Sequence, residues 1–302
     1  MKKRYLSILI IVLFSLALVA SCAEVVQVGT TIGQGMGQIS PEDKESIDRL
    51  AAQTAKAARP MTDEEEYYVG RAVGATILGQ YRLYANGRLT SYVNMVGQAA
   101  VLASDRPFTY GGYHVAILDT EEVNALSCPG GMIFITRGML QRVNNEDELA
   151  AVLAHEVAHV NHKDGLAAIQ KSRWVEAVSL LGSEAARKVG GAQFTQLVSI
   201  FQGSVDDVMK TLLVNGYGRE QESAADLSAL TFLHSLGYNP DALIDFLERL
   251  TKEQTRAPGP GVFKTHPGMS ERIVSARSLI SKNQWPRKED PGRDRRFREM
   301  RI

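Results

Sequence analysis

The sequence lacks the features that define several protein classes. It has only 2 cysteines, Cys22 and Cys128, in 302 residues, and if Cys22 is lipidated Cys128 has no partner, so we expect no disulfide framework. Its 34 basic and 34 acidic side chains balance, and we therefore expect no nucleic-acid partner. The longest apolar run, residues 6–20, is shorter than the roughly 20 residues that a membrane-spanning helix needs.

That apolar run has the pattern of a secretory signal. Basic residues at positions 2–4 precede it, and it ends in Val19-Ala20-Ser21-Cys22, which is similar to a bacterial lipobox. We expect residues 1–21 to be a lipoprotein signal peptide and Cys22 to be lipidated, with an uncleaved anchor or an ordinary signal as alternatives. The membrane would then be a partner, through a lipid anchor on the periplasmic side of a bacterial envelope, with the outer membrane as the expected site.

The rest of the chain is expected to form one catalytic domain. Residues 22–40 are rich in glycine and predict a flexible tether, residues 41–283 the domain, and residues 284–302 a solvated, partly disordered tail. Hydrophobic periodicity and caps predict many helices and three short strands. The expected fold class is α+β, mainly α, with a small, mostly antiparallel sheet beside one central helix. The strands are expected at residues 113–118, 124–127 and 132–136.

The central helix, which begins after Asn145, carries the motif H-E-x-x-H. His155 and His159 are four residues apart, so they lie on one helix face and can reach one metal ion. Glu156 follows the first histidine, where its carboxylate can reach a metal-bound water. The motif can occur by chance, but its place on a well-capped helix favours the metal interpretation. We expect His114 and two further histidines, His162 and His234, to be structural.

A catalytic zinc needs a third protein ligand. The metzincin pattern would need a glycine and a histidine where the sequence has His162 and Gly165, so it is excluded. A thermolysin-like glutamate about twenty residues after His159 is poorly supported, because no glutamate there has an aspartate four residues later. Glu222 and Asp226 are four apart on a predicted helix and could supply a ligand and an acceptor that orients an imidazole. A solvated acidic helix face is the alternative.

Together these stretches resemble the HtpX/CAAX-protease family of zinc metallopeptidases, in particular its soluble periplasmic members, over residues 62–281. The resemblance rests on the central motif, on Arg219-Glu220-Gln221-Glu222-Ser223-Ala224-Ala225-Asp226, and on Thr265-His266-Pro267. It implies a zincin (gluzincin-like) fold and one Zn²⁺ held by His155, His159 and Glu222. It also implies that Asp226 lies behind a ligand histidine and that His266 lies near the zinc, where it aids catalysis or closes the site.

The resemblance implies a zinc metalloendopeptidase that hydrolyses unfolded or misassembled cell-envelope proteins, with Glu156 as catalytic base. The alternative is a zinc-containing chaperone or binding lipoprotein with little proteolytic activity. We expect an edge strand to bind substrate by main-chain pairing, with a purely structural strand as the alternative. That strand consists of Asn124, Ala125, Leu126 and Ser127.

Overall fold

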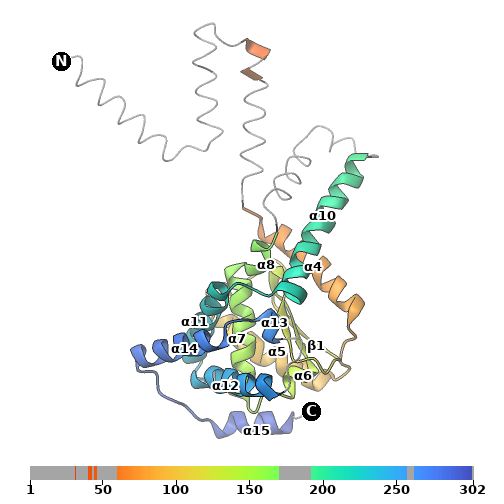
Figure 1. Ribbon diagram of the computed structural model, residues 1–302. Helices are drawn as coiled ribbons and strands as arrows, with labels where there is room; N and C mark the ends of the chain where they lie inside the picture. Colours follow the sequence, from red (N-terminus) through yellow and green to blue (C-terminus); the bar gives the residue numbers. More distant parts are fainter. Residues whose placement is uncertain are drawn as a thin grey trace, which may run out of the picture. The chain divides into compact units, whose positions relative to one another are not determined.

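The computed structural model describes residues 31, 40–42, 44–45, 60–169, 192–256 and 262–300 (Figure 1). The chain divides into two compact units, Met1–Pro60 with Lys171–Gly203 and Met61–Gln170 with Ser204–Ile302. The second unit contains the residues of the predicted site and is described below. The predicted signal peptide with Cys22, and most of the predicted tether, lie outside the described residues.

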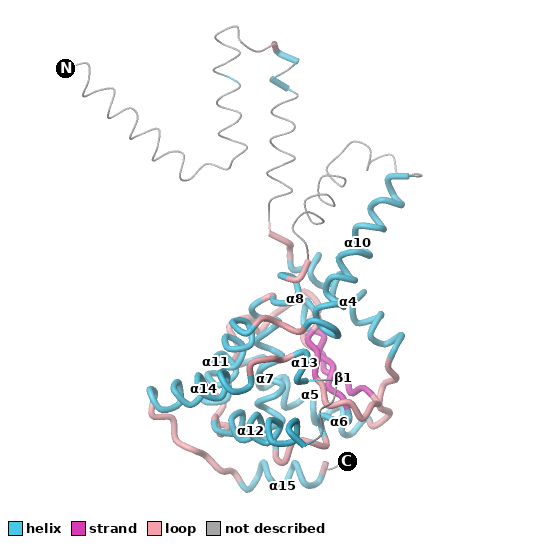
Figure 2. Tube along the Cα trace, viewed as in Figure 1, coloured by secondary structure: helices cyan, strands magenta, loops and turns pink. Residues whose placement is uncertain are grey.

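Helices dominate the described part of the chain (Figure 2). The strands are β1 (His114–Leu118), β2 (Ala125–Ser127) and β3 (Met132–Thr136), with a 3₁₀ turn η1 (Pro129–Gly131) and a π-helical turn η3 (Thr211–Asn215). The α-helices are α4 (Asp63–Gln80), α5 (Gly87–Leu102), α6 (Arg137–Leu140), α7 (Glu146–His162), α8 (Asp164–Ala167), α10 (Ala192–Lys210), α11 (Arg219–Ser235), α12 (Asp241–Arg256), α13 (Val262–Thr265), α14 (Met269–Asn283) and α15 (Pro291–Glu299).

The three strands form one mixed sheet in the order β1-β3-β2. β2 pairs antiparallel with β3, whereas β1 pairs parallel with β3. The α+β, mainly α class is confirmed, but the expectation of a mostly antiparallel sheet is wrong in this respect. The reason is the path of the chain. β2 forms one edge of the sheet, and η1, with Gly130 at φ 78°, reverses the direction of the chain. β3 then enters between β2 and β1. A strand inserted in this way runs in the direction of β1.

Both faces of the sheet are covered, as the alternation of side chains in β3 requires. Ile133 and Ile135 point to the larger hydrophobic core, which includes α5, α7, α11 and α12. Phe134, between them, points to a second core that includes residues of α4 and η3. The sheet is therefore a thin layer, and helix α7 lies against one of its faces.

Helix α7 is the centre of this unit (Figure 1). It contacts α5, α11, α12, α15 and β2, and every residue from Glu146 to Val160 is buried. The side chain of Asn145 caps its first turn by accepting a hydrogen bond from Glu148 N at 2.8 Å. Alanines such as Ala154 and Ala158 leave little side-chain bulk, so the neighbouring helices can approach the backbone of α7 closely. A helix buried in this way holds its side chains in fixed directions.

The C-terminal segment differs from the predicted disordered tail, because residues 291–299 form helix α15. Its cap is Asp290, whose side chain accepts hydrogen bonds from the backbone of Gly292 and Arg293. The buried Arg293 lies 3.2 Å from Asp147 on α7, and Arg296 lies 2.6 Å from Glu146. The charges that suggested a solvated tail have buried acidic partners on α7, and these partners are far away in the sequence.

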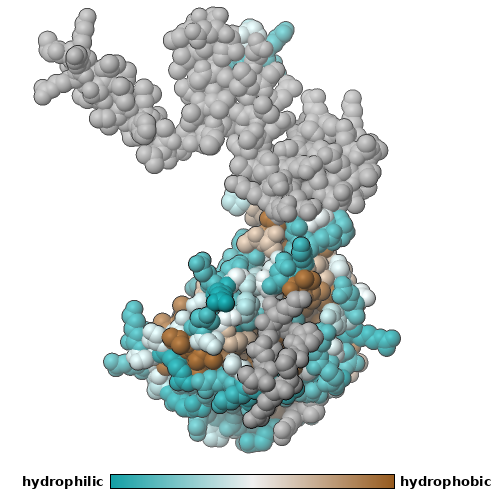
Figure 3. All heavy atoms as spheres, viewed as in Figure 1, coloured by the Kyte–Doolittle hydropathy of each residue, from teal (hydrophilic) through white to brown (hydrophobic). Residues whose placement is uncertain are grey.

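The described surface in Figure 3 is mostly hydrophilic, with small apolar patches. Among the described helices, none is both long and apolar enough to cross a membrane.

Candidate metal centre

Helix α7 brings its two motif histidines onto one side. His155 and His159 are buried, and their Nε2 atoms lie 3.0 Å apart. The spacing of four residues places them one turn apart, and the surrounding helices leave these side chains little room to move. The sequence prediction that both imidazoles face one point is consistent with this geometry.

Helix α11 supplies a carboxylate to the same point. Glu222, in its first turn, has no exposed surface and lies 3.4 Å from the Nε2 atoms of both His155 and His159. Helices α7 and α11 pack closely, with Ala225 and Ala229 of α11 fully buried. Small side chains therefore bring the two helices near enough for a carboxylate of one to reach the histidines of the other.

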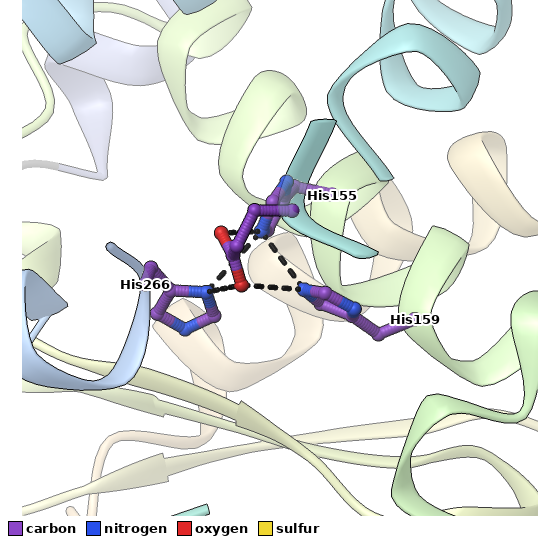
Figure 4. Close-up of side chains that lie close together, drawn as sticks. His155, His159 and His266 are labelled. Carbon is purple, nitrogen blue, oxygen red and sulfur yellow. Dashed lines mark hydrogen bonds and ion pairs between the residues drawn. The ribbon is translucent and has the colours of Figure 1, made fainter. Parts of the chain in front are cut away.

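His266, which follows α13, completes the cluster (Figure 4). Its Nδ1 atom lies 3.0 Å from Glu222 Oε1 and 3.3 Å from His155 Nε2. Its other ring nitrogen, Nε2, lies 3.7 Å from Glu156 Oε1. The structure thus brings together His155, His159, Glu222, His266 and Glu156, five of the six residues that the sequence placed in and around a metal site.

Two aspartates orient the histidines of α7 from outside the cluster. Asp164 Oδ2 lies 2.7 Å from His159 Nδ1. Asp226 Oδ1 lies 2.8 Å from His155 Nδ1, a distance that fits an ion pair although the atoms are not aligned as a hydrogen bond. With each Nδ1 atom directed at a carboxylate, the Nε2 lone pairs are left to point inward.

Arg272 on α14 connects two of the acids. Its guanidinium reaches both oxygens of Asp226, at 2.6 and 2.8 Å, and lies 2.7 Å from Glu222 Oε2. All three side chains are buried. This arrangement fixes the carboxylate of Glu222 relative to the aspartate behind His155.

The buried charges make the site electronegative. Burial raises the pKa of Glu222, but His266, His155 and His159 more than offset this and hold the pKa well below its usual range. For Asp226, burial raises the pKa and Arg272 lowers it, which leaves a pKa of about 2. The buried carboxylates of the site, on Glu156, Asp164, Glu222 and Asp226, outnumber its one buried guanidinium, on Arg272, which contacts only Glu222 and Asp226.

The pKa values of the histidines reflect the same negative electrostatic environment. Burial lowers the pKa of His155 and His159, yet nearby carboxylates outweigh burial and raise both. Asp226 has the largest raising effect on His155, and Asp164 on His159. The site therefore favours positive charge, which either protons or a cation can supply.

The donor set fits a tetrahedral metal ion. Four ligands at about 2.05 Å from a metal lie roughly 3.3 Å from one another. The observed separations between donor atoms of His155, His159, Glu222 and His266 are 3.0–3.4 Å for the closest pairs, and all four atoms lie within 4.8 Å. Two-nitrogen or three-nitrogen sets with one carboxylate are typical of zinc and related divalent metals. These four residues could therefore hold one such ion.

Glu156 lies beside this cluster but is not part of it. Its side chain is buried, and its Oε2 atom has no hydrogen-bond partner among the described residues. A buried carboxylate oxygen without a donor is costly, unless water or a substrate supplies the missing proton. Glu156 therefore has the free acceptor that a catalytic base needs.

The predicted substrate strand lies at the edge of the sheet, as β2. Backbone bonds join Asn124 and Cys128 to β3, so the alternation of an antiparallel pair directs the peptide groups of Ala125 and Ser127 away from the sheet. However, Asn124, Ala125, Leu126 and Ser127 are all buried. Thr211, Leu212 and Tyr217 lie against β2 around a space too small to admit a water molecule.

The remaining cysteine and histidines lie outside the cluster. Cys128 is buried and free, and burial raises the pKa of its thiol, so it is held protonated. His114 is bonded to the carbonyl of Gly111, His162 lies 3.1 Å from Ser228 Oγ, and His234 stacks on Trp285. These environments fit the structural roles expected of all three histidines.

Sequence reasoning missed two positioning residues and one aromatic neighbour. Asp164 reaches His159 because Lys163 adopts the left-handed conformation, φ 59°, and turns the chain back at the end of α7. Arg272 reaches Asp226 across 46 positions of the sequence, so no local pattern links the two residues. Tyr217 stacks on the ring of His159 with centroids 4.2 Å apart. Of these three residues, only Asp164 could have been found from the sequence, because it is an acid five residues after His159.

A helix with two histidines one turn apart, a facing glutamate from a second helix and an adjacent acid has the arrangement of a metallopeptidase active site. Residues 88–280 match the family model described as peptidase family M48, and the chain belongs to this family. The resemblance found in the motifs is thereby confirmed at the level of the family.

Named relatives agree with this assignment. The chain is 26% identical over 253 residues to the beta-barrel assembly-enhancing protease of Escherichia coli K12, covering 80% of this chain and 49% of the relative. It is 24% identical to a protease HtpX homolog of Salinibacter ruber, covering 56% and 69% respectively. It is 27% identical to the mitochondrial metalloendopeptidase OMA1 of Schizosaccharomyces pombe, covering 54% and 45%. The chain spans about half the length of the first of these relatives.

Proposed function

We propose that this protein is a zinc-dependent endopeptidase that hydrolyses unfolded or misassembled proteins of the bacterial cell envelope. The observation that carries the proposal is the buried convergence of His155, His159 and Glu222 beside the unpartnered carboxylate oxygen of Glu156. Membership of peptidase family M48 and the relatives named as proteases support hydrolysis of peptide bonds.

In this proposal His155, His159 and Glu222 hold the zinc, which when bound supplies Lewis-acid activation of water and of the scissile carbonyl. Glu156 takes a proton from the attacking water at a carboxylate oxygen and passes it to the leaving amine. Asp164 and Asp226 hold the histidine rings in their orientation through the Nδ1 atoms. Arg272 keeps Glu222 and Asp226 in place.

In this proposal His266 would be the fourth ligand of the resting site, in place of the water that an open four-coordinate catalytic site keeps. Its Nδ1 atom is as close to Glu222 as the α7 histidines are, at 3.0 Å, and it is buried. We therefore assign His266 the role of closing the resting site, the second of the two roles expected from the sequence.

The substrate would bind as an added strand along β2. The peptide groups of Ala125 and Ser127 point outward, but the Ala125 N–H donates to Asn124 Oδ1 at 3.0 Å and would have to exchange this partner for the substrate. Main-chain pairing would tolerate many sequences and favour unfolded segments. The residues that cover β2, such as Leu212 and Tyr217, would have to move first. Lipidation of Cys22 would anchor the protein to the periplasmic side of a membrane, with the outer membrane as our choice, and envelope proteins would then be its substrates.

A second candidate function is a zinc-containing chaperone with little proteolytic activity. The burial of the site favours it, because Glu156 is only 2% exposed and His266, also buried, would take the ligand position that a catalytic water needs. The two candidates differ in one measurable way, since only a peptidase depends on the carboxylate of Glu156.

One experiment tests the proposal with two variants. Purified wild type, Glu156→Gln and His266→Ala are compared for zinc content by mass spectrometry and for cleavage of reduced, unfolded protein. We expect about one zinc in each, no cleavage by Glu156→Gln, and cleavage by His266→Ala at or above the wild-type rate. Loss of cleavage in His266→Ala would instead assign it a catalytic role. Cleavage by Glu156→Gln at the wild-type rate would refute the assigned base, and zinc-containing wild type that cleaves nothing would favour the chaperone.

A further inference from the structure

A small apolar cavity opens beside the candidate base. Its walls include Glu156 and His155 on one side and Leu243, Phe246, Leu247 and Leu250 of α12 on the other. The four α12 residues follow the spacing i, i+3, i+4, i+7, so they form one stripe of that helix. Each is at most 3% exposed. The cavity thus joins the reacting centre to a stripe of hydrocarbon.

The cavity also borders the proposed substrate strand. Ala125 of β2 is part of its wall, and so are Val262 and Met269, which lie on either side of His266. A peptide paired with β2 places alternate side chains on opposite faces of the sheet. The residue next to the scissile bond would therefore direct its side chain either into this cavity or to the opposite face.

The chemistry of the walls restricts what the cavity can hold. Arg272 is the only guanidinium in the lining, and Asp226 and Glu222 already occupy it. No wall residue is left to neutralise a carboxylate or to accept from a lysine without disturbing Glu156 or the histidines. An ionised side chain buried there without a partner would be costly.

The size of the cavity restricts the occupant further. Its volume is about 30 Å³, enough for one or two water-sized groups. A larger cavity of about 200 Å³ lies between Tyr92 and Phe297, but none of the site residues lines it. The larger cavity is therefore not placed to contact a substrate at the site, whereas the small apolar cavity borders both Glu156 and His266.

We propose that this cavity is the specificity pocket of the enzyme, and that it selects a small aliphatic side chain, such as that of alanine or valine, next to the scissile bond. The inference rests on the proposed peptidase function and adds a substrate preference to it. Leu250 is then a specificity-determining residue, because its side chain forms part of the apolar wall.

The test uses the purified full-length protein with its zinc. Reduced, unfolded β-casein is digested, and the cleaved bonds are identified by mass spectrometry. Peptides copied from one cleaved bond, with Ala, Val, Leu, Phe, Asp or Lys at the selected position, then give kcat/KM values. We expect Ala and Val to be preferred and Asp and Lys to react at least tenfold more slowly, as a mismatch in an apolar pocket commonly costs this much.

Variants then test the residues. Leu250→Ala should enlarge the pocket and raise the kcat/KM ratio of Phe or Leu to Val by at least tenfold. Ile244→Ala is the matched control, because Ile244 lies on the same helix and is equally buried but does not line the cavity. Val262→Ala, which removes less volume, serves if Leu250→Ala does not fold, and it should change the ratio in the same direction.

The outcomes separate the pocket from the function. If wild type cleaves equally well next to charged residues, or if Leu250→Ala and Ile244→Ala have the same preference, the pocket assignment is refuted and the peptidase remains. If zinc-containing wild type cleaves neither casein nor any peptide, the proposed function fails and the pocket assignment fails with it.

Discussion

The two ends of helix α7 both bury ionisable groups, but they do so in opposite ways. At the N-terminal end, Glu146, Asp147 and Glu148 are buried, and each carboxylate oxygen accepts a hydrogen bond. The donors come from tyrosines, arginines and backbone amides of other elements. At the C-terminal end, the lone pairs of two imidazoles and a carboxylate face one another, without enough donors between them. Both ends bury charged groups, but only the C-terminal end has acceptors that a bound ligand would satisfy.

The difference separates stability from function. Acids in the first turn of a helix interact favourably with its dipole, and with every oxygen paired they hold α7 in the core. Acceptors that converge without donors destabilise the fold until a proton or a cation joins them. A cluster of buried charges therefore indicates a ligand site only when acceptor lone pairs converge without matching donors.

The largest expected effect is a loss of zinc affinity when the glutamate at the C-terminal end of α7 is replaced, compared with the same replacement at the N-terminal end. Glu222→Gln keeps the shape of the side chain but removes the charge of a metal ligand. A structural zinc contributes about 10–16 kcal/mol through four ligands, so one ligand corresponds to roughly 3–4 kcal/mol, or about 100–1,000-fold in affinity. Titration of the apo protein with zinc in the presence of a competing chelator measures this loss.

Glu146→Gln is the matched control for that experiment. Glu146 has no exposed surface and is bonded to Tyr92, Tyr238 and Arg296, so its loss should lower the melting temperature. We expect its zinc affinity to stay within about twofold of wild type. Equal loss of zinc affinity in both variants would mean that the two ends of α7 do not differ in the way described.

The next largest effect is on the free energy of unfolding and concerns only the N-terminal end of α7, where the acids are paired. Arg293→Met removes the guanidinium that lies 3.2 Å from Asp147, with both side chains at most 10% exposed. Removing one partner of a buried ion pair leaves the other uncompensated and costs about 3 kcal/mol or more. Urea unfolding should show this decrease in the free energy of unfolding, while zinc content stays at the wild-type level.

Arg287→Met provides the exposed counterpart. Arg287 pairs with Asp245 at 2.7 Å, but its side chain is 57% exposed. Exposed pairs contribute less than about 1 kcal/mol. If both arginine variants unfold at the same urea concentration, helix α15 does not stabilise α7 through buried pairing.

The same contrast explains how much the sequence could predict. Strand β3 and helix α7 were predictable because alternation and helical periodicity are local patterns. His155 and His159 follow from local spacing, and the carboxylate of Glu222 became credible through its companion Asp226. These are features in which a few neighbouring residues determine the geometry.

The features that were missed depend on residues far apart in the sequence. Arg293 and Arg296 suggested a solvated tail, because their partners on α7 lie nearly 150 positions away. The parallel pairing of β1 with β3 depends on the path of the chain through β2 and η1. The position of Asp164 behind His159 depends on the left-handed conformation of Lys163, which a lysine rarely adopts and which the sequence therefore does not predict.

Substitution of Asp164 is expected to have the smallest effect on zinc affinity at the C-terminal end of α7. It lies 2.7 Å from His159 Nδ1, and its other oxygen accepts from Gln221 on α11, next to Glu222 in the sequence. The carboxylate thus orients one histidine and connects the two helices that supply the metal ligands. Asp164→Asn keeps an acceptor but removes the charge that favours the inward Nε2 lone pair.

We expect Asp164→Asn to weaken zinc binding by about 10–100-fold, the usual effect of losing a carboxylate behind a ligand histidine. The melting temperature of the apo protein should change little, because the amide oxygen can still accept from His159. Asp119→Asn is the surface control, since Asp119 is 43% exposed and pairs only with Arg137 among the ion pairs of the described chain. A merely structural Asp164 would lower the melting temperature and leave zinc affinity per folded molecule intact, whereas a positioning role shifts the affinity and spares the fold.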